Sequence, residues 1–263
     1  MSQAPLLYSV EDGVACITLN RPESLNSFNT EMHAEMRKAL KAVRQDSSVR
    51  ALLLTGSGRG FCAGQDLSDR SVAPGAEAPD LGESLEKRYN PMLRAFKDMP
   101  FPTICAVNGV AAGAGANIAL ACDIVLAARS ASFIQAFCKI GLIPDSGGTW
   151  TLPNLVGMAR AKGLAMLGDK LPAETAEQWG MIWRCVDDEA LQEEAMSMAR
   201  HLATQPTRGL ALIKRALHAS SDNSFNKQLD LERDLQRLAG RSDDYREGVS
   251  AFMEKRRPTF KGE

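Results

Sequence analysis

Apolar residues near the start of the chain follow two spacings, one typical of strands and one typical of helices. The stretch LLYSVEDGVACITLN predicts two short strands, because EDG is a hairpin turn signal between two apolar runs. Residues 30–46 carry apolar side chains at helical spacing, with Asn29 or Thr30 as the candidate N-cap. A buried strand is predicted at 49–56. These elements indicate that strands and helices alternate along the chain.

The middle of the chain continues this alternation. A helix is predicted at about 84–98 and a strand at 102–109, and residues 109–128 combine a strand, a glycine-broken turn, a short helix and another strand. Residues 68–82 are rich in Pro, Gly, Ala and acids, and they predict a mobile loop of the lid type. Because the connections are short, the pattern favours an α/β fold whose parallel strands are crossed over by helices.

The C-terminal part of the chain has a different pattern. From about residue 155 it is almost wholly helical, apart from a strand-like piece at 176–188. The last helical stretches carry apolar residues on one face and charges on the other. We therefore expect a core formed by residues 1–200 and a helical oligomerisation region formed by residues 201–263.

Composition and charge narrow the class of protein. The chain has 263 residues, with 31 basic and 32 acidic side chains, and this balance argues against a broad surface for nucleic acid or anionic membranes. Hydrophobic residues make up 44% of the chain, enough to bury a full-sized core. The 6 cysteines lack the paired spacing of a metal site, and neither a secretory signal nor a membrane-spanning run is evident. We expect a soluble, cytoplasmic protein with reduced thiols and no metal.

Two glycine-rich segments, CAGQDL at 62–67 and AAGAGAN at 111–117, are candidates for chemistry. Glycine lets another group approach the backbone closely, and a helix start presents N–H groups that the helix itself cannot bond. Two such N–H groups that converge on one oxygen form an oxyanion hole. The alternative is that both segments are tight turns that serve packing alone. Neither glycine-rich stretch has the full pattern of a dinucleotide-binding turn.

Asp145 lies in the stretch GLIPDSGGTW, after an apolar run and before two glycines. One hypothesis is that its carboxylate caps the helix that follows, because Asp is a favoured N-cap residue. The other is that it transfers protons, since burial among Phe137, Ile143 and Pro144 would raise its pKa and make it a stronger base. The residue types alone leave both roles open, and the two roles can coexist.

Several linked motifs carry a resemblance to a known family. RPESLNSFN, FCAGQDL, AVNGVAAGAGANIALACD, GLIPDSGGTWTLP and AEQWGMIWRCVDD follow one another as in the enoyl-CoA hydratase/isomerase (crotonase) superfamily. The resemblance covers nearly the whole chain, and it implies a ClpP/crotonase-like spiral of ββα units with a C-terminal helical trimerisation region. It also implies a homotrimer or dimer of trimers that acts on acyl-CoA thioesters. No cofactor beyond the CoA of the substrate, no nucleic acid and no membrane is expected as a partner.

The resemblance also implies roles for individual residues. The backbone N–H groups of Gln65 and Ala114 match the donors that stabilise a thioester enolate. Asn117 and Phe137 fall where hydratases carry two glutamates, so two-glutamate addition of water is not expected. Asp145 falls where isomerases carry a catalytic aspartate. A single carboxylate suits an isomerase, because one base can remove a proton beside the thioester carbonyl and return it to a vinylogous carbon.

The same resemblance places substrate contacts along two segments and at the C-terminus. They are Glu23, Ser24, Leu25, Gly64, Asp66, Leu67 and Phe260 for CoA, with Asn117 and Phe137 beside the acyl group. The alternative is that these segments are ordinary surface turns. In related proteins the C-terminal contact sometimes comes from a neighbouring subunit. The run EKRR that precedes Phe260 is either a further CoA contact or a solvated helix end.

Within the superfamily, the motifs FCAGQDL, GLIPDSGGTW and GMIW are similar to those of isomerases that act in phenylacetate degradation on an aromatic acyl-CoA that carries a ring epoxide. A general isomerase of cis or trans enoyl-CoA chains is one alternative, and a non-catalytic crotonase-fold scaffold or RNA binder is another. A reaction of the 4-chlorobenzoyl-CoA dehalogenase type needs a histidine base in the acyl pocket, which the resemblance places in residues 60–140. The histidines His33, His201 and His218 all lie outside that segment, so this reaction is not expected. We expect His33 and His218 to be surface residues with a structural role.

Overall fold

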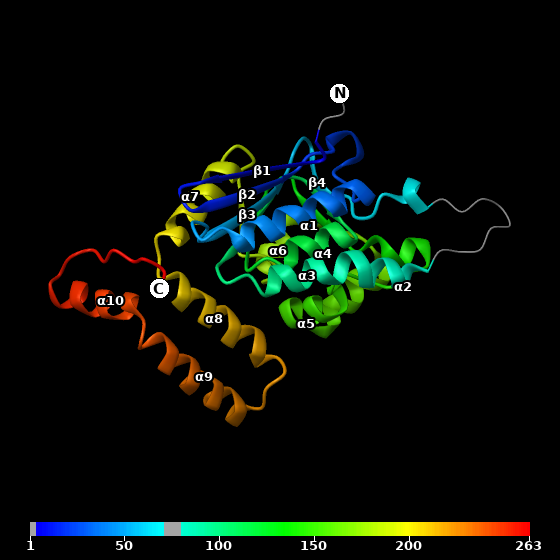
Figure 1. Ribbon diagram of the computed structural model, residues 1–263. Coiled ribbons are helices and arrows are strands. Elements are labelled where there is room, and N and C mark those ends of the chain that lie inside the picture. The colour runs from blue at the N-terminus through cyan, green and yellow to red at the C-terminus, as the bar shows by residue number, and fades with distance from the viewer. Residues whose placement is uncertain (1–3, 71–79) are drawn as a thin grey trace.

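The computed structural model describes residues 4–70 and 80–263, and two β-sheets form its centre (Figure 1). The larger sheet has six strands in the order β1 (Leu6–Glu11), β2 (Val14–Leu19), β3 (Ala51–Gly56), β5 (Thr103–Val107), β7 (Ile124–Ala128) and β10 (Arg184–Val186). The smaller sheet has four strands in the order β4 (Gly60–Cys62), β6 (Val110–Ala112), β8 (Ser132–Ile134) and β9 (Lys170–Pro172). The strand pairs are parallel except β1 with β2 and β8 with β9.

Consecutive strands divide between the two sheets. Each of the pairs β3–β4, β5–β6 and β7–β8 gives its first strand to the larger sheet and its second strand to the smaller one. Helices follow each pair, so the chain repeats a ββα unit. This confirms the α/β fold and the ββα spiral expected from the sequence. The initial hairpin is also confirmed, because Asp12 and Gly13, both with positive φ, form its two-residue turn.

The helices of the first two hundred residues cover the sheets. They are α1 (Thr30–Gln45), α2 (Leu81–Ser84), α3 (Asn90–Lys97), α4 (Ala114–Leu120), α5 (Gly148–Leu167), α6 (Ala173–Gln178) and α7 (Leu191–Ala203). A π-helical segment, Leu85–Tyr89, joins α2 to α3, and 3-10 turns span Pro22–Ser24, Leu67–Arg70 and Ala136–Ile140. Residues 71–79 of the predicted lid-type loop lie outside the described residues.

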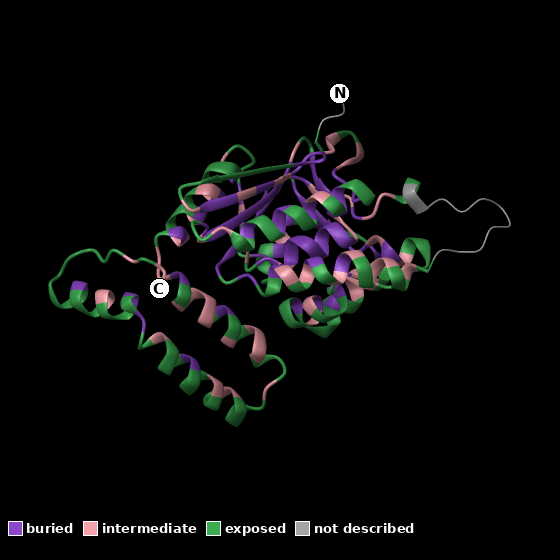
Figure 2. Cartoon of the chain, viewed as in Figure 1, coloured by how far each residue is buried: buried purple, intermediate pink, exposed green. Residues whose placement is uncertain are grey.

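The first helix, α1, shows how local sequence positions an element. The side chain of Asn29 accepts a hydrogen bond from the N–H of Met32, so Asn29 is the N-cap that the helix uses. The apolar residues at helical spacing are buried against the sheet: Met32, Met36, Ala39, Leu40 and Val43. Figure 2 shows the same principle across the molecule, with burial concentrated on the strands and on α4.

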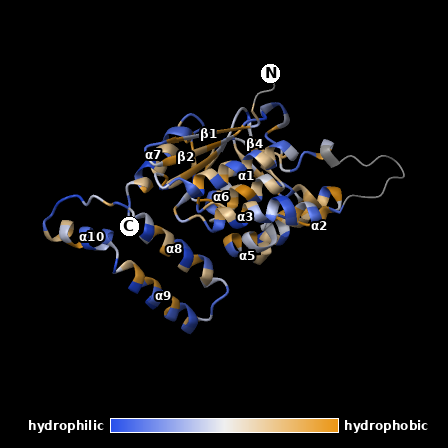
Figure 3. Cartoon of the chain, in the orientation of Figure 1, coloured by the Kyte–Doolittle hydropathy of each residue, from blue (hydrophilic) through white to orange (hydrophobic). Residues whose placement is uncertain are grey.

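The last three helices extend away from the sheets (Figure 1). They are α8 (Thr207–Ser220), α9 (Phe225–Ala239) and α10 (Asp243–Met253). Figure 3 shows apolar stripes on these helices. Their exposed apolar side chains include Ile213, Leu217, Phe225, Leu229, Phe252 and Met253. Exposed apolar surface of this extent is typical of an interface with another protein chain. Within residues 4–70 and 80–263, no helix combines the length and apolar character that crossing a bilayer requires.

Candidate active site

The two glycine-rich segments lie against each other. A Cβ added to Gly64 would lie 3.3 Å from the backbone nitrogen of Ala114, and a Cβ added to Gly115 would lie 2.3 Å from the carbonyl oxygen of Cys62. A larger residue at either crossing would therefore require the backbone to move. The structure brings together the segments that carry Gln65 and Ala114, a convergence that the sequence alone did not establish.

The two predicted donors lie beside this crossing. Ala114 is the first residue of α4, so its N–H has no partner within its own helix. Gln65 pairs with Phe28 in an isolated parallel bridge, which uses the carbonyl of Gly64 at 2.7 Å and the N–H of Asp66 at 3.0 Å. The N–H of Gln65 therefore faces the opposite side of this short extended segment. The arrangement fits two N–H groups that converge on one oxygen.

The segments predicted to contact CoA are tied together beside the crossing. Asn26 is fully buried, and its amide donates a 2.8 Å hydrogen bond to the carbonyl of Gly60. The N–H of Ala63 donates to the carbonyl of Leu25 at 2.9 Å. These bonds hold the segment 23–25 against the loop that contains Gly64, so the predicted CoA contacts of the N-terminal half lie side by side.

Arg21 is a cation at this surface that the sequence reasoning missed. Its guanidinium lies 3.0 Å from the carboxylate of Asp66 and donates to the carbonyl of Ser27 at 2.6 Å. The hydroxyl of Ser68 and the guanidinium of Arg21 lower the pKa of Asp66, so this side chain is an anion at neutral pH. The sequence contained one indication of this role, because Arg21 begins the stretch RPESLN, which contains the predicted CoA contacts at 23–25.

A buried aromatic cluster supports the side chain of Gln65. The hydroxyl of Tyr89 donates to Oε1 of Gln65 at 3.0 Å, and the ring centroids of Phe28 and His33 lie 6.2 and 4.5 Å from that of Tyr89. His33 is only 4% exposed, so the expectation that it lies on the surface is wrong. It is buried because the inner face of α1 packs against this cluster. Tyr89, which the sequence reasoning also missed, ends the π-helical segment, an irregularity that is frequent at functional sites.

Phe137 lies beside the start of α4. Its ring Cζ lies 3.7 Å from the position of a Cβ added to Gly113, the residue that precedes Ala114. The ring is buried. The position where the resemblance places the second glutamate of hydratases therefore carries a buried aromatic ring next to a predicted oxyanion donor.

Asp145 is not the N-cap of α5. The N-cap is Gly147, where no side-chain hydrogen bond caps the helix, so the capping hypothesis is wrong. The carboxylate of Asp145 accepts a 2.9 Å hydrogen bond from the hydroxyl of Ser146, and its backbone carbonyl accepts a 2.8 Å bond from the amide of Asn117. Because Asn117 and Ala114 are three residues apart on one face of α4, Asp145 is tied to the helix that presents a predicted donor.

The surroundings of Asp145 are more open than the sequence indicated. Asp145 and Pro144 are half-buried and Phe137 is buried. Ile143, however, is 77% exposed. The expectation that Ile143 helps to bury the carboxylate is therefore wrong for the single chain.

Comparison with known proteins assigns this arrangement to a family. The family model of enoyl-CoA hydratase/isomerase matches residues 9–263. The chain belongs to the enoyl-CoA hydratase/isomerase family. It is 63% identical over 257 residues to the 1,2-epoxyphenylacetyl-CoA isomerase of Escherichia coli (strain K12), with 98% of each chain covered. It is 36% identical to the trans-2-decenoyl-[acyl-carrier-protein] isomerase of Streptococcus mutans, again over 98% of each chain. The crystal structure of an enoyl-CoA hydratase from Bacillus anthracis matches with a TM-score of 0.92 at 31% identity, over 98% of this chain and 100% of that one.

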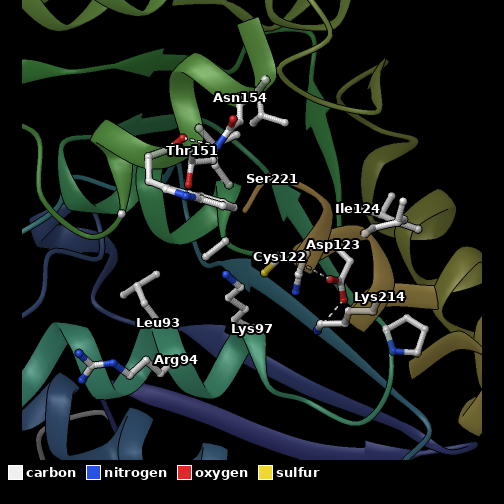
Figure 4. Close-up of a pocket in the computed structure, with 18 of the residues that line it drawn as sticks. Leu93, Arg94, Lys97, Cys122, Asp123, Ile124, Thr151, Asn154, Lys214 and Ser221 are labelled. Carbon is white, nitrogen blue, oxygen red and sulfur yellow. Dashed lines mark hydrogen bonds and ion pairs between the residues drawn. The ribbon is translucent and has the colours of Figure 1, made fainter. Parts of the chain in front are cut away.

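In this member of the enoyl-CoA hydratase/isomerase family, the structure contains an apolar cavity (Figure 4) whose lining includes the two residues that follow Asp145. Its volume is about 710 Å³, and it is lined mainly by α3, α5 and α8. Ser146, whose hydroxyl bonds Asp145, and Gly147 form part of its wall. A residue of the cavity wall, Ser146, is therefore hydrogen-bonded to the carboxylate of Asp145.

A charged cluster joins α8 to the sheet at this cavity. Lys214 is buried, and it donates to the carboxylate of Asp123 at 2.8 Å (Figure 4). It also donates to the carbonyl of Phe96 at 2.9 Å. Thr103 donates to the same carboxylate oxygen through both its N–H and its hydroxyl, each at 2.8 Å. His218 lies 3.8 Å from Asp123, and its pKa is lowered because partial burial outweighs the attraction of that carboxylate.

Phe260 does not join the other predicted CoA contacts within one subunit. Its carbonyl accepts a 3.0 Å hydrogen bond from Arg50, which precedes β3, whereas the Gly64 loop lies beyond the other end of that strand. A strand of this length spans roughly 20 Å. Figure 1 shows the C-terminus on the opposite side of the molecule from α2. Within the single chain, Phe260 therefore lies apart from the Gly64 loop.

The described part of the chain, 4–70 with 80–263, contains no group of three His, Cys, Asp or Glu residues that could hold a metal ion.

Proposed function

We propose that the chain is an acyl-CoA isomerase that converts 1,2-epoxyphenylacetyl-CoA to its oxepin isomer in phenylacetate catabolism. The 63% identity to the Escherichia coli isomerase, over 98% of both chains, supports the reaction and the substrate. The observation of the structure that carries the proposal is the attachment of the Asp145 turn to α4 through Asn117. Asn117 and Phe137 stand where the family resemblance places the two glutamates of a hydratase, so Asp145 is the acid that this proposal uses.

Asp145 is the proposed acid and base. Its carboxylate removes a proton from the carbon next to the thioester carbonyl, and the electrons of that C–H bond pass into an enolate. The N–H groups of Gln65 and Ala114 stabilise the enolate oxygen, and one such donor is worth roughly 10²–10³ in rate. In the ring epoxide, the C–C bond shared by the epoxide and the six-membered ring breaks as its electrons shift within the ring, which gives the seven-membered oxepin, and the carboxyl group returns the proton to a ring carbon vinylogous to the thioester. The reaction adds no atom and removes none, so it needs no second acid/base and no cofactor beyond the CoA of the substrate.

The proposed CoA surface consists of the two segments that Asn26 holds together. Its members are Glu23, Ser24, Leu25, Gly64, Asp66 and Leu67, and Arg21 adds a cation for the phosphates. Phe260 contributes from a neighbouring subunit. We propose a homotrimer or a dimer of trimers, and the exposed apolar residues of α8, α9 and α10 support assembly through that region.

A general enoyl isomerase is the second candidate. Two observations favour it: the 36% identity to a decenoyl-carrier-protein isomerase, and the apolar cavity of about 710 Å³ next to the Asp145 turn, which suits a chain longer than a phenyl ring. Both candidates use the same carboxylate and the same N–H donors, so they differ in the acyl group and not in mechanism.

The deciding experiment compares the wild type, Asp145→Asn and a control variant, Asp222→Asn, in the turn after α8. Turnover of 1,2-epoxyphenylacetyl-CoA and of a 3-enoyl-CoA is measured, together with thermal stabilisation by each ester. We expect Asp145→Asn to lose about 10²–10⁴-fold in kcat while it still binds both esters, because asparagine keeps the shape but transfers no proton. Full activity of Asp145→Asn would refute the mechanism. Faster turnover of the 3-enoyl-CoA would identify the second candidate, and binding without turnover by the wild type would indicate a non-catalytic binding protein.

A further inference from the structure

The turn that carries Asp145 has an unfavourable backbone conformation. Ser146 has φ of 51° and Gly147 has φ of 78°, so two consecutive residues lie in the left-handed region. A residue with a side chain stays there only when its surroundings over-determine the conformation. Ser146 is buried, and its hydroxyl is bonded to the carboxylate of Asp145. The conformation of this turn thus determines where the carboxylate lies.

Asn117 is the side chain that holds the turn from the side of α4. It is 2% exposed, and its Nδ2 donates to the carbonyl of Asp145 at 2.8 Å. The N–H of Gly148 donates to the same carbonyl, also at 2.8 Å, so two donors fix this peptide group. The contact is tight, because a Cβ added to Gly148 would lie 2.3 Å from Nδ2 of Asn117. The turn therefore has little freedom to move while the amide stays in place.

Gln135 determines which way the amide of Asn117 faces. Its Nε2 donates to Oδ1 of Asn117 at 2.9 Å, and Gln135 is itself only 3% exposed. Since Oδ1 is engaged by this donor, the NH₂ group of Asn117 is directed at Asp145. A chain of two side-chain amides thus runs from β8 and the 3-10 turn, through α4, to the turn of Asp145.

We propose that Asn117 and Gln135 are positioning residues for the isomerase, and that they hold Asp145 in its reactive position through its backbone carbonyl. The proposal rests on the proposed function of Asp145. It also changes the role expected for Asn117, from a contact of the acyl group to a clamp on the base. An ionised glutamate at position 117 has no proton to donate to the carbonyl of Asp145, so the clamp and a two-glutamate hydratase site exclude each other.

The test measures kcat and KM for 1,2-epoxyphenylacetyl-CoA in Asn117→Leu and Gln135→Met, with unfolding temperature as a second readout. We expect kcat of Asn117→Leu to fall about 10–100-fold with KM within about threefold of wild type, since a small displacement of the base affects the reaction step and not binding. Gln135→Met should lower kcat about 3–10-fold, because it only frees the orientation of the amide. The matched control is Gln228→Leu, which removes a 3.1 Å amide-to-carbonyl bond between α9 and α8 and should leave kcat unchanged.

Each outcome decides the proposal. If Asp145→Asn is inactive while both amide variants keep the kcat of the wild type, the clamp is refuted and the proposed function stands. An increase in KM at constant kcat would return Asn117 to substrate binding and also refute the clamp. If Asn117→Leu does not fold, Gln135→Met alone decides, because it leaves the contact between Asn117 and Gly148 intact. If Asp145→Asn is fully active, the proposed function of Asp145 is refuted, and the clamp is refuted as well because it rests on that function.

Discussion

The hydroxyl of Tyr89 donates a 3.0 Å hydrogen bond to Oε1 of Gln65. The bond joins the end of the π-helical segment to the loop that carries a predicted oxyanion donor. Tyr89 is fully buried, and its ring packs edge-on against that of His33. The geometry of the loop therefore depends on a helix that is distant in sequence.

Replacement Tyr89→Phe removes this bond and keeps the ring. A neutral hydrogen bond contributes about 1 kcal/mol, so we expect a loss of about that size in the free energy of unfolding and a fall of about 3–10-fold in kcat/KM. Steady-state kinetics and urea denaturation measure the two effects. Tyr8→Phe, on the exposed face of β1, is the control and should change neither quantity. A kcat/KM of Tyr89→Phe equal to that of the wild type would show that the side chain of Gln65 does not position its own N–H.

Gly115→Ala tests the crossing of the two glycine-rich segments. The new Cβ would lie 2.3 Å from the carbonyl oxygen of Cys62, which is backbone and cannot rotate away. We expect a loss of about 1–3 kcal/mol in stability and a fall of more than about tenfold in kcat/KM, because the donor segments must separate. Gly163→Ala in α5 is the opposite case, since no atom beyond its chain neighbours and its own helix backbone lies within 4 Å of the added Cβ. This control should gain about 0.5–1 kcal/mol. Equal unfolding temperatures for the two variants would contradict the close approach.

Lys214→Met tests the charged cluster behind the cavity. The change leaves the carboxylate of Asp123 with its bonds from Thr103 but without its cation. Removal of one member of a buried ion pair costs about 3–5 kcal/mol, and the partial exposure of Asp123 favours the lower end of that range. Lys38→Met breaks an exposed pair with Glu35 and should cost less than about 0.5 kcal/mol. Chemical denaturation measures both, and a loss below about 1 kcal/mol for Lys214→Met would exclude a stabilising role for the pair.

His218 should make the stability depend on pH. Its pKa is lowered below 6.5 chiefly by burial, with contributions from Lys214 and Lys97, while Asp123 and Asp98 oppose the shift. Between its lowered folded pKa and about 6.5, the unfolded chain binds more protons than the folded one, so stability is lost as the pH falls through this window. We expect His218→Gln to lose less stability than the wild type between pH 7.5 and 5.5. Between pH 7.5 and 8.5 His218 is neutral in both states, so the two proteins should respond alike. Parallel losses at acid pH would refute the assignment.

Local patterns in the sequence predicted the strands of the larger sheet and most helices, but not the short strands β4, β8 and β9 of the smaller sheet. The turn at Asp12 and Gly13, the cap of α1 and its buried face all follow from interactions within a few residues. The ββα spiral was implied by linked motifs, which keep their order in a known family. The roles of Gln65, Ala114 and Asp145 and the trimeric assembly stay predictions. The segment that covers residues 71–79 lies outside the described structure.

The errors of the sequence reasoning have a common cause. Asp145 has the residue type of an N-cap, but Gly147 occupies that position because the turn is held by Asn117 on another helix. His33 is a residue type expected on the exposed face of a charged helix, but the rings of Phe28 and Tyr89 pack against its ring. In each case a deciding partner, Asn117 for Asp145 and Tyr89 for His33, lies far away along the chain.

The sequence by itself determined most of the elements and the family, and it predicts the replacement of both hydratase glutamates, because these depend on residue type and on short-range order. Only the tertiary structure decided that the glycine-rich segments meet, that Tyr89 supports Gln65, and that Asn117 and Gln135 hold the Asp145 turn. Hydrogen bonds and close backbone approaches between distant segments require atoms to be within a few ångströms of each other, and spacing along a chain does not specify such distances.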